Sequence, residues 1–295
     1  MSLIVKNVNK SFGDKKVVDN LSFELSKPGV FGLLGTNGAG KTTAIRMILG
    51  IIKKDSGDIT WNNKEVTRKN VNFGYLPEER GLYPKSKIYD QLMYFANLKG
   101  MNKVDADKAI KYWLEKLKVS EYINYTAEKL SKGNQQKIQF ITSVLHNPDL
   151  IVLDEPFSGL DPVNTEILSN VMKELIKEGK YIIMSSHQMN SIEEFCTDLV
   201  ILNRGKTVLK GNLKEIKNSY KSSKILLETD DDVKKIINKL KLNILSNNDG
   251  TYIIEVNEDE NKKLFKELVD NNISISKYEV IKPSLHEIFI EKVGE

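Results

Sequence analysis

The feature that most constrains this chain is a glycine-rich loop ending in a lysine and two hydroxyl residues: Gly35, Thr36, Asn37, Gly38, Ala39, Gly40, Lys41, Thr42 and Thr43. Glycines let backbone N–H groups turn inward around a phosphate, the lysine reaches terminal phosphates, and a hydroxyl can bind Mg²⁺. The apolar run at residues 30–34 predicts a buried strand before the loop, and apolar spacing at residues 44–49 predicts a helix after it. Together they predict an α/β core that binds nucleotide phosphates.

Composition is typical of a globular protein. The 295 residues are 40% hydrophobic and 28% charged, which suits one large or two ordinary domains. The net charge of +4 arises from many charges of both signs, so we expect no nucleic-acid partner. The single cysteine, Cys196, excludes an internal disulfide and suits a reducing compartment. No apolar run approaches the roughly 20 residues that span a bilayer, so we expect that the chain does not cross a membrane alone.

The pattern along the chain predicts two domains. Alternation in residues 3–25 predicts antiparallel strands at 3–8, 17–18 and 21–25, whereas the apolar runs at 150–153 and 181–184 predict buried parallel strands. Helical spacing between them predicts a helical subdomain at about residues 80–148. We therefore expect a nucleotide-binding domain over residues 1–217.

Beyond about Tyr220 the order of expected elements is βαββαβ, with the last strand at residues 273–280 and a terminal helix at 285–293. This order predicts a small α+β domain with a ferredoxin-like fold. We expect it to occupy residues 218–295.

The strand at residues 150–153 ends in two carboxylates, Asp154 and Glu155. Beside a phosphate loop, the first can hold Mg²⁺ through water, and the second can orient and deprotonate an attacking water. The alternative is a strand that ends at a solvated acidic turn. The run at residues 156–162, rich in Pro, Gly and Asp, favours the functional interpretation.

Two further positions, Ser131 and His187, give only weak evidence of function when each is taken alone. Ser131 precedes an apolar-periodic helix and suits an N-cap, which is a common feature. His187 follows the strand at 181–184, where an imidazole could reach a γ-phosphate or make a local hydrogen bond. His146 and His286 lack metal-ligand neighbours, so we interpret them as surface or packing residues.

Taken together, these motifs resemble those of the ATP-binding cassette (ABC) family over residues 2–215. Residues 35–42 are similar to its Walker A loop, 150–155 to its Walker B strand, 131–135 to its signature motif and 158–161 to its D-loop. The resemblance implies catalytic roles for Glu155 and His187.

The resemblance also implies the cofactors ATP and Mg²⁺. It places Mg²⁺ near Thr42, Asp154 and Glu78. It places ATP against the whole loop from Gly35 to Thr43, against the signature residues Ser131, Gly133 and Asn134, and against Phe12 as an adenine platform. For Phe12, a place in the core of a hairpin is the alternative.

Two departures from the family pattern stand out. In the signature, Lys132 and Asn134 replace a glycine and a glutamine, while Ser131 and Gly133 are kept. In the family's Q-loop, Glu78 takes the place of glutamine, which offers Mg²⁺ an extra oxygen but adds negative charge beside ATP.

Residues 102–105, Asn-Lys-Val-Asp, match the guanine-reading tetrapeptide of small GTPases. In those proteins the motif follows a buried strand, whereas here it opens an amphipathic helix. We therefore interpret it as the start of a helix, and we expect ATP rather than GTP.

The resemblance implies that two copies, or this chain and a paralogue, sandwich two ATP molecules. It further implies an ATPase subunit that powers a separate integral membrane permease from the cytoplasmic face of the membrane, with the permease docking near residues 79–84.

The C-terminal module resembles that of sodium and drug exporters, which favours export. A soluble ABC ATPase acting on a macromolecular partner such as the ribosome is the alternative, although such proteins usually hold two cassettes in one chain. A regulatory module without turnover is disfavoured by Asp154, Glu155 and His187.

Overall fold

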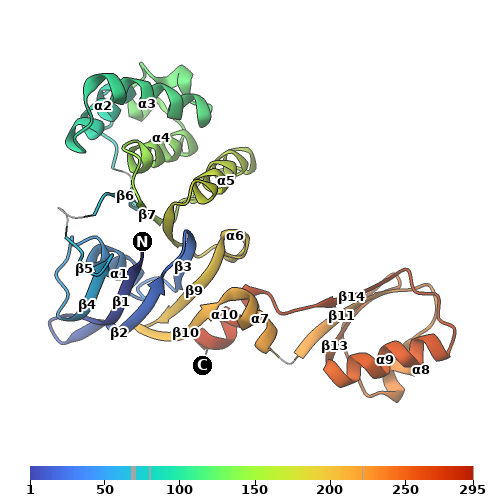
Figure 1. Ribbon diagram of the computed structural model, residues 1–295. Coiled ribbons are helices and arrows are strands. Elements are labelled where there is room, and N and C mark those ends of the chain that lie inside the picture. The colour runs from blue at the N-terminus through green and yellow to red at the C-terminus, as the bar shows by residue number, and fades with distance from the viewer. Residues whose placement is uncertain (68–70, 80, 221, 295) are drawn as a thin grey trace. The chain divides into compact units, whose positions relative to one another are not determined.

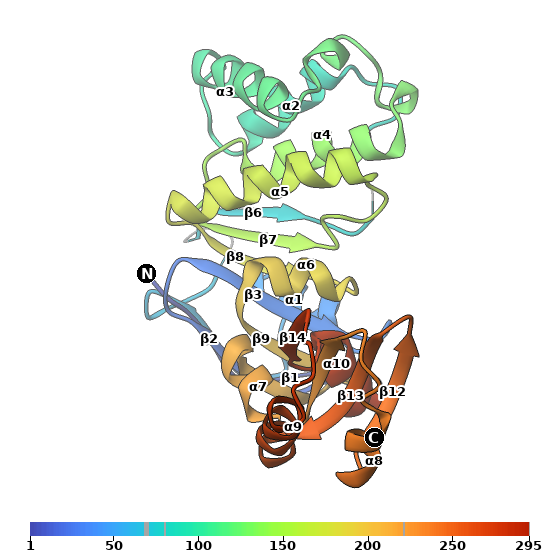
Figure 2. The same cartoon turned by 90° about the vertical axis from the view of Figure 1, so that its right-hand side faces the viewer.

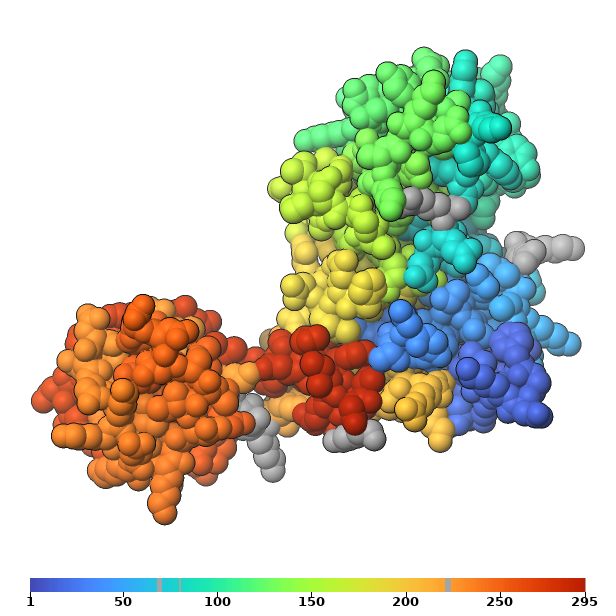
Figure 3. Space-filling model, turned by 180° about the vertical axis from the view of Figure 1, so that it is seen from behind, coloured from blue at the N-terminus to red at the C-terminus, as the bar shows by residue number. Residues whose placement is uncertain are grey.

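The computed structural model describes residues 1–67, 71–79, 81–220 and 222–294. Its contacts divide the chain into two compact units, Met1–Gly211 and Asn212–Glu295, which we describe separately. Figure 1 shows the elements of both units, and Figure 3 shows their surfaces, with the second unit mostly in orange and red. Arg80, within the expected docking stretch, lies outside the described residues.

The first unit is built on one mixed sheet. Its strands β1, β2, β4 and β5 pair antiparallel, whereas β9, β3, β8, β7 and β6 pair parallel. The antiparallel pairing of β1 with β2 and the parallel pairing of β7 with β8 agree with the sequence analysis. In sheet order the strands are β5 (Lys64–Glu65), β4 (Ser56–Trp61), β1 (Leu3–Phe12), β2 (Lys15–Leu25), β10 (Lys206–Asn212), β9 (Cys196–Asn203), β3 (Gly29–Gly35), β8 (Tyr181–Ser185), β7 (Leu150–Asp154) and β6 (Phe73–Leu76).

Strand β2 differs from the expectation of separate strands at residues 17–18 and 21–25. It is continuous, and its register against β1 shifts at several points. Asn20 takes a left-handed φ of 54° within the strand, which breaks the alternation on which the prediction relied. One strand with irregular pairing therefore spans residues 15–25, where the sequence pattern predicts two separate strands.

The helices of the first unit cover the parallel strands and form a separate helical subdomain. Figures 1 and 2 show α2, α3 and α4 gathered beyond the edge of the sheet that carries β6 and β7. Asn102 caps α3, because its side chain accepts a hydrogen bond from the Asp105 N–H at 3.0 Å. The helices are α1 (Lys41–Ile48), α2 (Ile88–Leu98), α3 (Lys103–Lys116), α4 (Lys132–Val144), α5 (Pro162–Lys177) and α6 (Met189–Phe195), with 3₁₀ turns at Ser120–Tyr122 and Ala127–Lys129.

Helix α4 packs unusually close to strand β6. A Cβ atom on Gly74 would lie 1.7 Å from the carbonyl oxygen of Ser143, so this position excludes every other residue type. The neighbouring Phe73 carbonyl is bound by the Lys99 ammonium at 2.9 Å and, just beyond the end of α4, by His146 Nε2 at 3.0 Å. Strand β6 and helix α4 are therefore held as one piece.

The second unit has the predicted ferredoxin-like order. Its antiparallel sheet runs β12 (Asn243–Asn248), β13 (Thr251–Asn257), β11 (Ser222–Glu228) and β14 (Lys277–Ile281). The helices are α7 (Leu213–Ser219), α8 (Lys234–Lys239), α9 (Glu258–Asp270) and α10 (Leu285–Gly294). The last strand begins at Lys277 rather than at 273, because Ile273 and Ile275 pack against the hydrophobic core from an irregular segment. In the described part of the chain, no helix is long and apolar enough to cross a membrane.

His146 generates a prediction about acid stability. Burial lowers the pKa of its imidazole from 6.5 to about 4. Because the unfolded chain takes up this proton below about pH 6.5 and the folded chain does not, the free energy of unfolding should fall as the pH drops from 6.5 toward 4. Urea unfolding at pH 7 and pH 5 measures this loss. His146→Gln should lose less stability over that interval, and an equal loss in both proteins would contradict the assignment.

Candidate functional site

The phosphate loop lies between β3 and α1, and its glycines are required by geometry. Gly38 and Gly40 take left-handed φ values of 77° and 103°. A Cβ on Gly40 would lie 2.5 Å from the Val17 carbonyl oxygen, and a Cβ on Gly35 would lie 2.5 Å from that of Leu202. The loop therefore packs against two neighbouring strands while residues 36–38 remain exposed.

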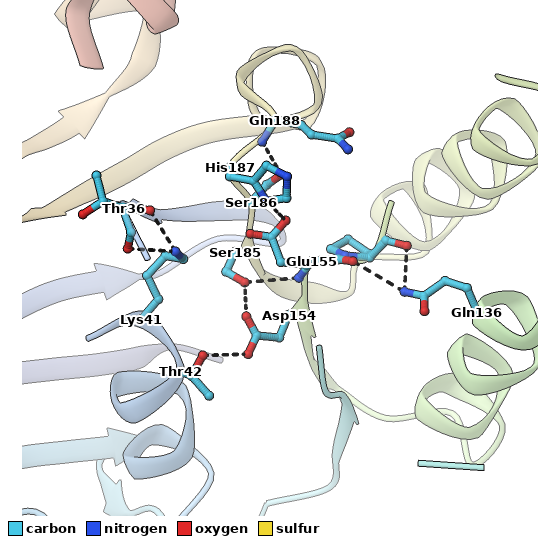
Figure 4. Close-up of polar contacts among 12 residues, drawn as sticks. Thr36, Lys41, Thr42, Gln136, Asp154, Glu155, Ser185, Ser186, His187 and Gln188 are labelled. Carbon is cyan, nitrogen blue, oxygen red and sulfur yellow. Dashed lines mark hydrogen bonds and ion pairs between the residues drawn. The ribbon is translucent and has the colours of Figure 1, made fainter. Parts of the chain in front are cut away.

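Lys41 closes this loop. Its side chain is buried, and its ammonium donates hydrogen bonds to the carbonyl oxygens of Gly35 at 2.8 Å and Thr36 at 3.4 Å (Figure 4). The charge is thus held at the mouth of the loop, beside the first residue of α1. Phosphate oxygens that enter the loop would meet both this charge and the N-terminus of the helix.

Asp154 joins three elements at the carboxyl ends of the parallel strands. It is buried at the end of β7, and its two oxygens accept hydrogen bonds from Thr42 Oγ1, at 3.2 Å, and from the Ser185 hydroxyl (Figure 4). Carboxylate and hydroxyl oxygens are the ligands that Mg²⁺ prefers, so the pair Thr42 and Asp154 fits the expected metal.

Glu78 follows β6 in an exposed loop and makes no hydrogen bond to Thr42 or Asp154 among the described residues. It lies close enough to Tyr75 to affect that side chain. Burial, and then the charge of Asp154, raise the pKa of the Tyr75 hydroxyl, and the charge of Glu78 adds a smaller effect in the same direction. Both carboxylates therefore act electrostatically on one hydroxyl group.

Glu155 and His187 form a pair. His187 Nδ1 lies 2.9 Å from Glu155 Oε2, and the glutamate is buried while the imidazole is 60% exposed. Glu155 takes a left-handed φ of 54°, and its backbone N–H binds the Ser185 carbonyl at 3.2 Å. A buried carboxylate that is oriented by an imidazole, one residue after the expected metal ligand Asp154, suits a base that accepts a proton from water.

The signature residues lie at the exposed start of α4. Ser131 caps this helix, because its hydroxyl accepts a hydrogen bond from the Asn134 N–H at 3.2 Å. Gly133 is buried against the beginning of α5, where an added Cβ would lie 3.4 Å from Asn164 Nδ2. In the part of the chain that the structure describes, Ser131, Gly133 and Asn134 make no hydrogen bond to the phosphate loop of the same chain.

Phe12 ends strand β1 and is 51% exposed, so it is not a core residue of the hairpin. The Lys10 ammonium lies 5.3 Å from the centre of its ring. An exposed ring with a free face is what stacking on a base requires.

Sequence reasoning missed three polar residues that support the site. Ser185 binds both Asp154 and the backbone N–H of Glu155, at 3.3 Å for the latter. Gln136 and Gln139 donate to backbone carbonyls next to Glu155 and Glu78. A serine at the end of a buried strand is a usable sequence signal, whereas the glutamines carry none beyond their place on an amphipathic helix.

Comparison with known proteins places these observations in one family. Two family models match the chain: ABC transporter over residues 18–158, and the C-terminal domain of DrrA1-3-like ATP-binding proteins over residues 211–293. The uncharacterized ABC transporter ATP-binding protein YhaQ of Bacillus subtilis (strain 168) is 48% identical over 294 residues, which are 99% of this chain and 98% of that protein. The chain belongs to the ABC transporter family.

Two more comparisons agree. The Nod factor export ATP-binding protein I of Rhizobium etli is 34% identical over 211 residues, or 70% of this chain and 66% of that protein. A solved ATP binding subunit of an ABC transporter superposes with a TM-score of 0.68 at 28% identity, covering 74% of this chain and 92% of that one. This chain is therefore an ATP-binding, ATP-hydrolysing subunit of an ABC transporter.

The position of Lys41 predicts the effect of removing its charge. Lys41→Ala should lower the rate of ATP hydrolysis at least about 100-fold, because a preorganised cation next to the phosphates is lost. Lys53→Ala, which removes an exposed lysine outside the loop, is the control. Phosphate release measured with Mg²⁺ and ATP compares the two, and a wild-type rate in Lys41→Ala would rule out this loop as the phosphate site.

Proposed function

We propose that this chain works as one of a pair of ATP-hydrolysing subunits that powers export through a separate membrane permease. The observation that carries the proposal is a group of five residues at the carboxyl ends of the parallel strands: Lys41, Thr42, Asp154, Glu155 and His187. The name of the Nod factor export relative supports the direction of transport. Neither YhaQ nor the Nod factor export protein is named for action on the ribosome, so we do not favour that alternative.

Each residue has a distinct part in hydrolysis. Lys41 and the N–H groups of the loop bind the terminal phosphates of ATP, and Thr42 and Asp154 would hold Mg²⁺, which neutralises charge on the phosphate oxygens when it is bound. Glu155 accepts the proton of the attacking water. The His187 imidazole keeps the Glu155 carboxylate oriented through its 2.9 Å contact. We assign the exposed part of the same imidazole to the γ-phosphate of ATP.

The signature motif supports a paired arrangement. Ser131 and the first N–H groups of α4 form an exposed helix N-terminus, which suits an anion. Because Ser131, Gly133 and Asn134 do not bind the chain's own phosphate loop, we assign them to the ATP held by a second chain. A second copy or a paralogue fulfils this requirement, and Lys132 adds positive charge at the same place.

An aromatic surface after the Q-loop supports docking of a permease. Tyr83 and Tyr94 are 53% and 50% exposed, and with Ser86, Asp90 and Gln91 they line a hollow of about 310 Å³. The buried Gln91 amide fixes the loop, because it donates to the carbonyls of Tyr83 and Ser86. A rigid hollow with apolar walls suits an amphipathic helix of a partner.

We assign this contact to the cytoplasmic face of the membrane. The second unit, Asn212–Glu295, contains the domain expected at residues 218–295, and we assign it as an accessory domain of the same subunit. Its match to the DrrA1-3-like C-terminal domain supports this assignment.

Glu155→Gln tests the mechanism. The amide keeps the shape of the side chain but cannot accept the proton, so hydrolysis should fall about 100-fold or more while ATP still binds. Unhydrolysed ATP should then hold two chains together by ligand linkage. Size-exclusion chromatography with light scattering should show a dimer with ATP and Mg²⁺ and a monomer without nucleotide.

The control for this experiment is Glu155→Gln combined with Lys41→Ala, which should remain a monomer. A Glu155→Gln variant that stays monomeric in saturating ATP, or that hydrolyses ATP at the wild-type rate, would refute the sandwich arrangement.

Glu78→Gln tests the proposed metal ligand in the Q-loop. The substitution should leave ATP binding intact and raise the Mg²⁺ concentration needed for half-maximal hydrolysis about two- to tenfold, because one charged oxygen ligand is lost. Glu79→Gln, which changes the adjacent exposed glutamate, is the matched control. Superimposable Mg²⁺ titrations of the wild type and Glu78→Gln would show that Glu78 lies away from the metal.

A further inference from the structure

Helix α4 carries two buried glutamines one turn apart, Gln136 and Gln139, which are 4% and 3% exposed. Both donate side-chain N–H groups to backbone carbonyls of other segments rather than of their own helix. Carbonyl oxygens only accept, so these contacts fix which end of each amide is the NH₂ group. An amide is costly to bury unless it is hydrogen-bonded, so both side chains depend on these partners.

Gln139 holds the Q-loop on both sides of Glu78. Its Nε2 lies 2.9 Å from the carbonyl oxygen of Glu79 and 3.2 Å from that of Pro77. One side chain therefore sets the backbone on either side of the Q-loop carboxylate. The Gln139 Oε1 atom is buried without a hydrogen-bond partner among the described residues, so the amide is bound through its N–H groups alone.

Gln136 holds the segment that carries the catalytic carboxylate. Its Nε2 lies 3.1 Å from the Pro156 carbonyl oxygen and 3.5 Å from that of Glu155 (Figure 4). A left-handed backbone at a glutamate is strained and persists only where surrounding contacts determine it. The Gln136 amide supplies such a contact on the carbonyl side of Glu155, and Ser185 supplies one on the N–H side.

The two contacts are linked mechanically. Residues three apart lie on the same side of a helix, so both amides project from one short segment of α4. The close approach at Gly74 keeps β6, which leads into the Q-loop, against the same helix. A movement of residues 77–79 thus acts on α4 directly, next to its contact with Glu155.

We propose that Gln139 is a positioning residue for Glu78 and acts through Gln136 on Glu155, so that one turn of α4 connects the Q-loop with the catalytic base. The proposal rests on the roles proposed above for Glu78 and Glu155. The consequence is that the Gln139 contacts set the rate of the chemical step more than the affinity for ATP.

Gln139→Met and Gln136→Met test this connection, because methionine keeps the side-chain length and removes the amide. Each should lower kcat about five- to tenfold at saturating Mg²⁺, with KM for ATP within about twofold of the wild type. In the Gln136→Met background, Gln139→Met should lower kcat no further. Thr142→Val is the matched control on the same helix. It should keep the wild-type kcat, because among the described residues the Thr142 hydroxyl donates only to the backbone carbonyl of Gln139, within α4, and does not contact the Q-loop or Glu155.

The outcomes distinguish the proposed connection from independent roles of the two glutamines and from an effect on ATP affinity alone. Additive losses in the double variant, an unchanged kcat in Gln139→Met, or a raised KM with an unchanged kcat would each overturn it. If Gln139→Met does not fold, Gln139→Asn tests the same contact, because its amide adds no charge and is one methylene too short to keep both hydrogen bonds to the loop. Wild-type hydrolysis in Glu155→Gln would instead refute the proposed base, and it is measured separately.

Discussion

The buried carboxylate of Asp154 is the interaction on which the site depends. Removing a carboxylate from water is costly unless it is paired or hydrogen-bonded, and here two hydroxyl groups satisfy it. Thr42 belongs to α1, Asp154 to β7 and Ser185 to β8, so one side chain fixes the relative positions of three elements. Glu155 follows Asp154 directly, and His187 lies two residues after Ser185. The hydrogen bond between Asp154 and Ser185 therefore also fixes the positions of Glu155 and His187.

Helix α4 has an equally central position in the proposed mechanism. In the proposed pair its N-terminus would present Ser131 to the ATP of a second chain, while its buried side holds the Q-loop and the segment of Glu155 in its own chain. A helix is stiff along its axis, so force on one end reaches the other with little loss. In the proposed pair, closure on ATP and movement of a permease would thus act on the same element, from opposite directions.

Local chemistry explains why much of this site was predictable from the sequence. The glycine loop, the buried parallel strands and the caps at Ser131 and Asn102 each depend on neighbours within a few residues. The contacts of Gln136, Gln139 and Ser185 join residues 19 to 62 positions apart, and no local pattern encodes them. The late start of β14 was missed for a related reason, because Ile273 and Ile275 are apolar and β-branched but serve the core without pairing.

The glutamate in the Q-loop adds its negative charge to that of Asp154 in the electrostatic surroundings of Tyr75. Burial, and then the charge of Asp154, raise the pKa of the Tyr75 hydroxyl, and a tyrosine hydroxyl is neutral near pH 7 in any case, so it adds no further negative charge. A hydrogen bond from Arg46, on the exposed side of α1, brings a positive charge to the same hydroxyl. Asp154, Glu78 and Arg46 all affect this one hydroxyl group, and carboxylate oxygens such as those of Asp154 are ligands that Mg²⁺ takes. In our proposal the Gln139 amide holds the backbone on both sides of Glu78 from the helix side, at a loop where the family pattern has its own glutamine.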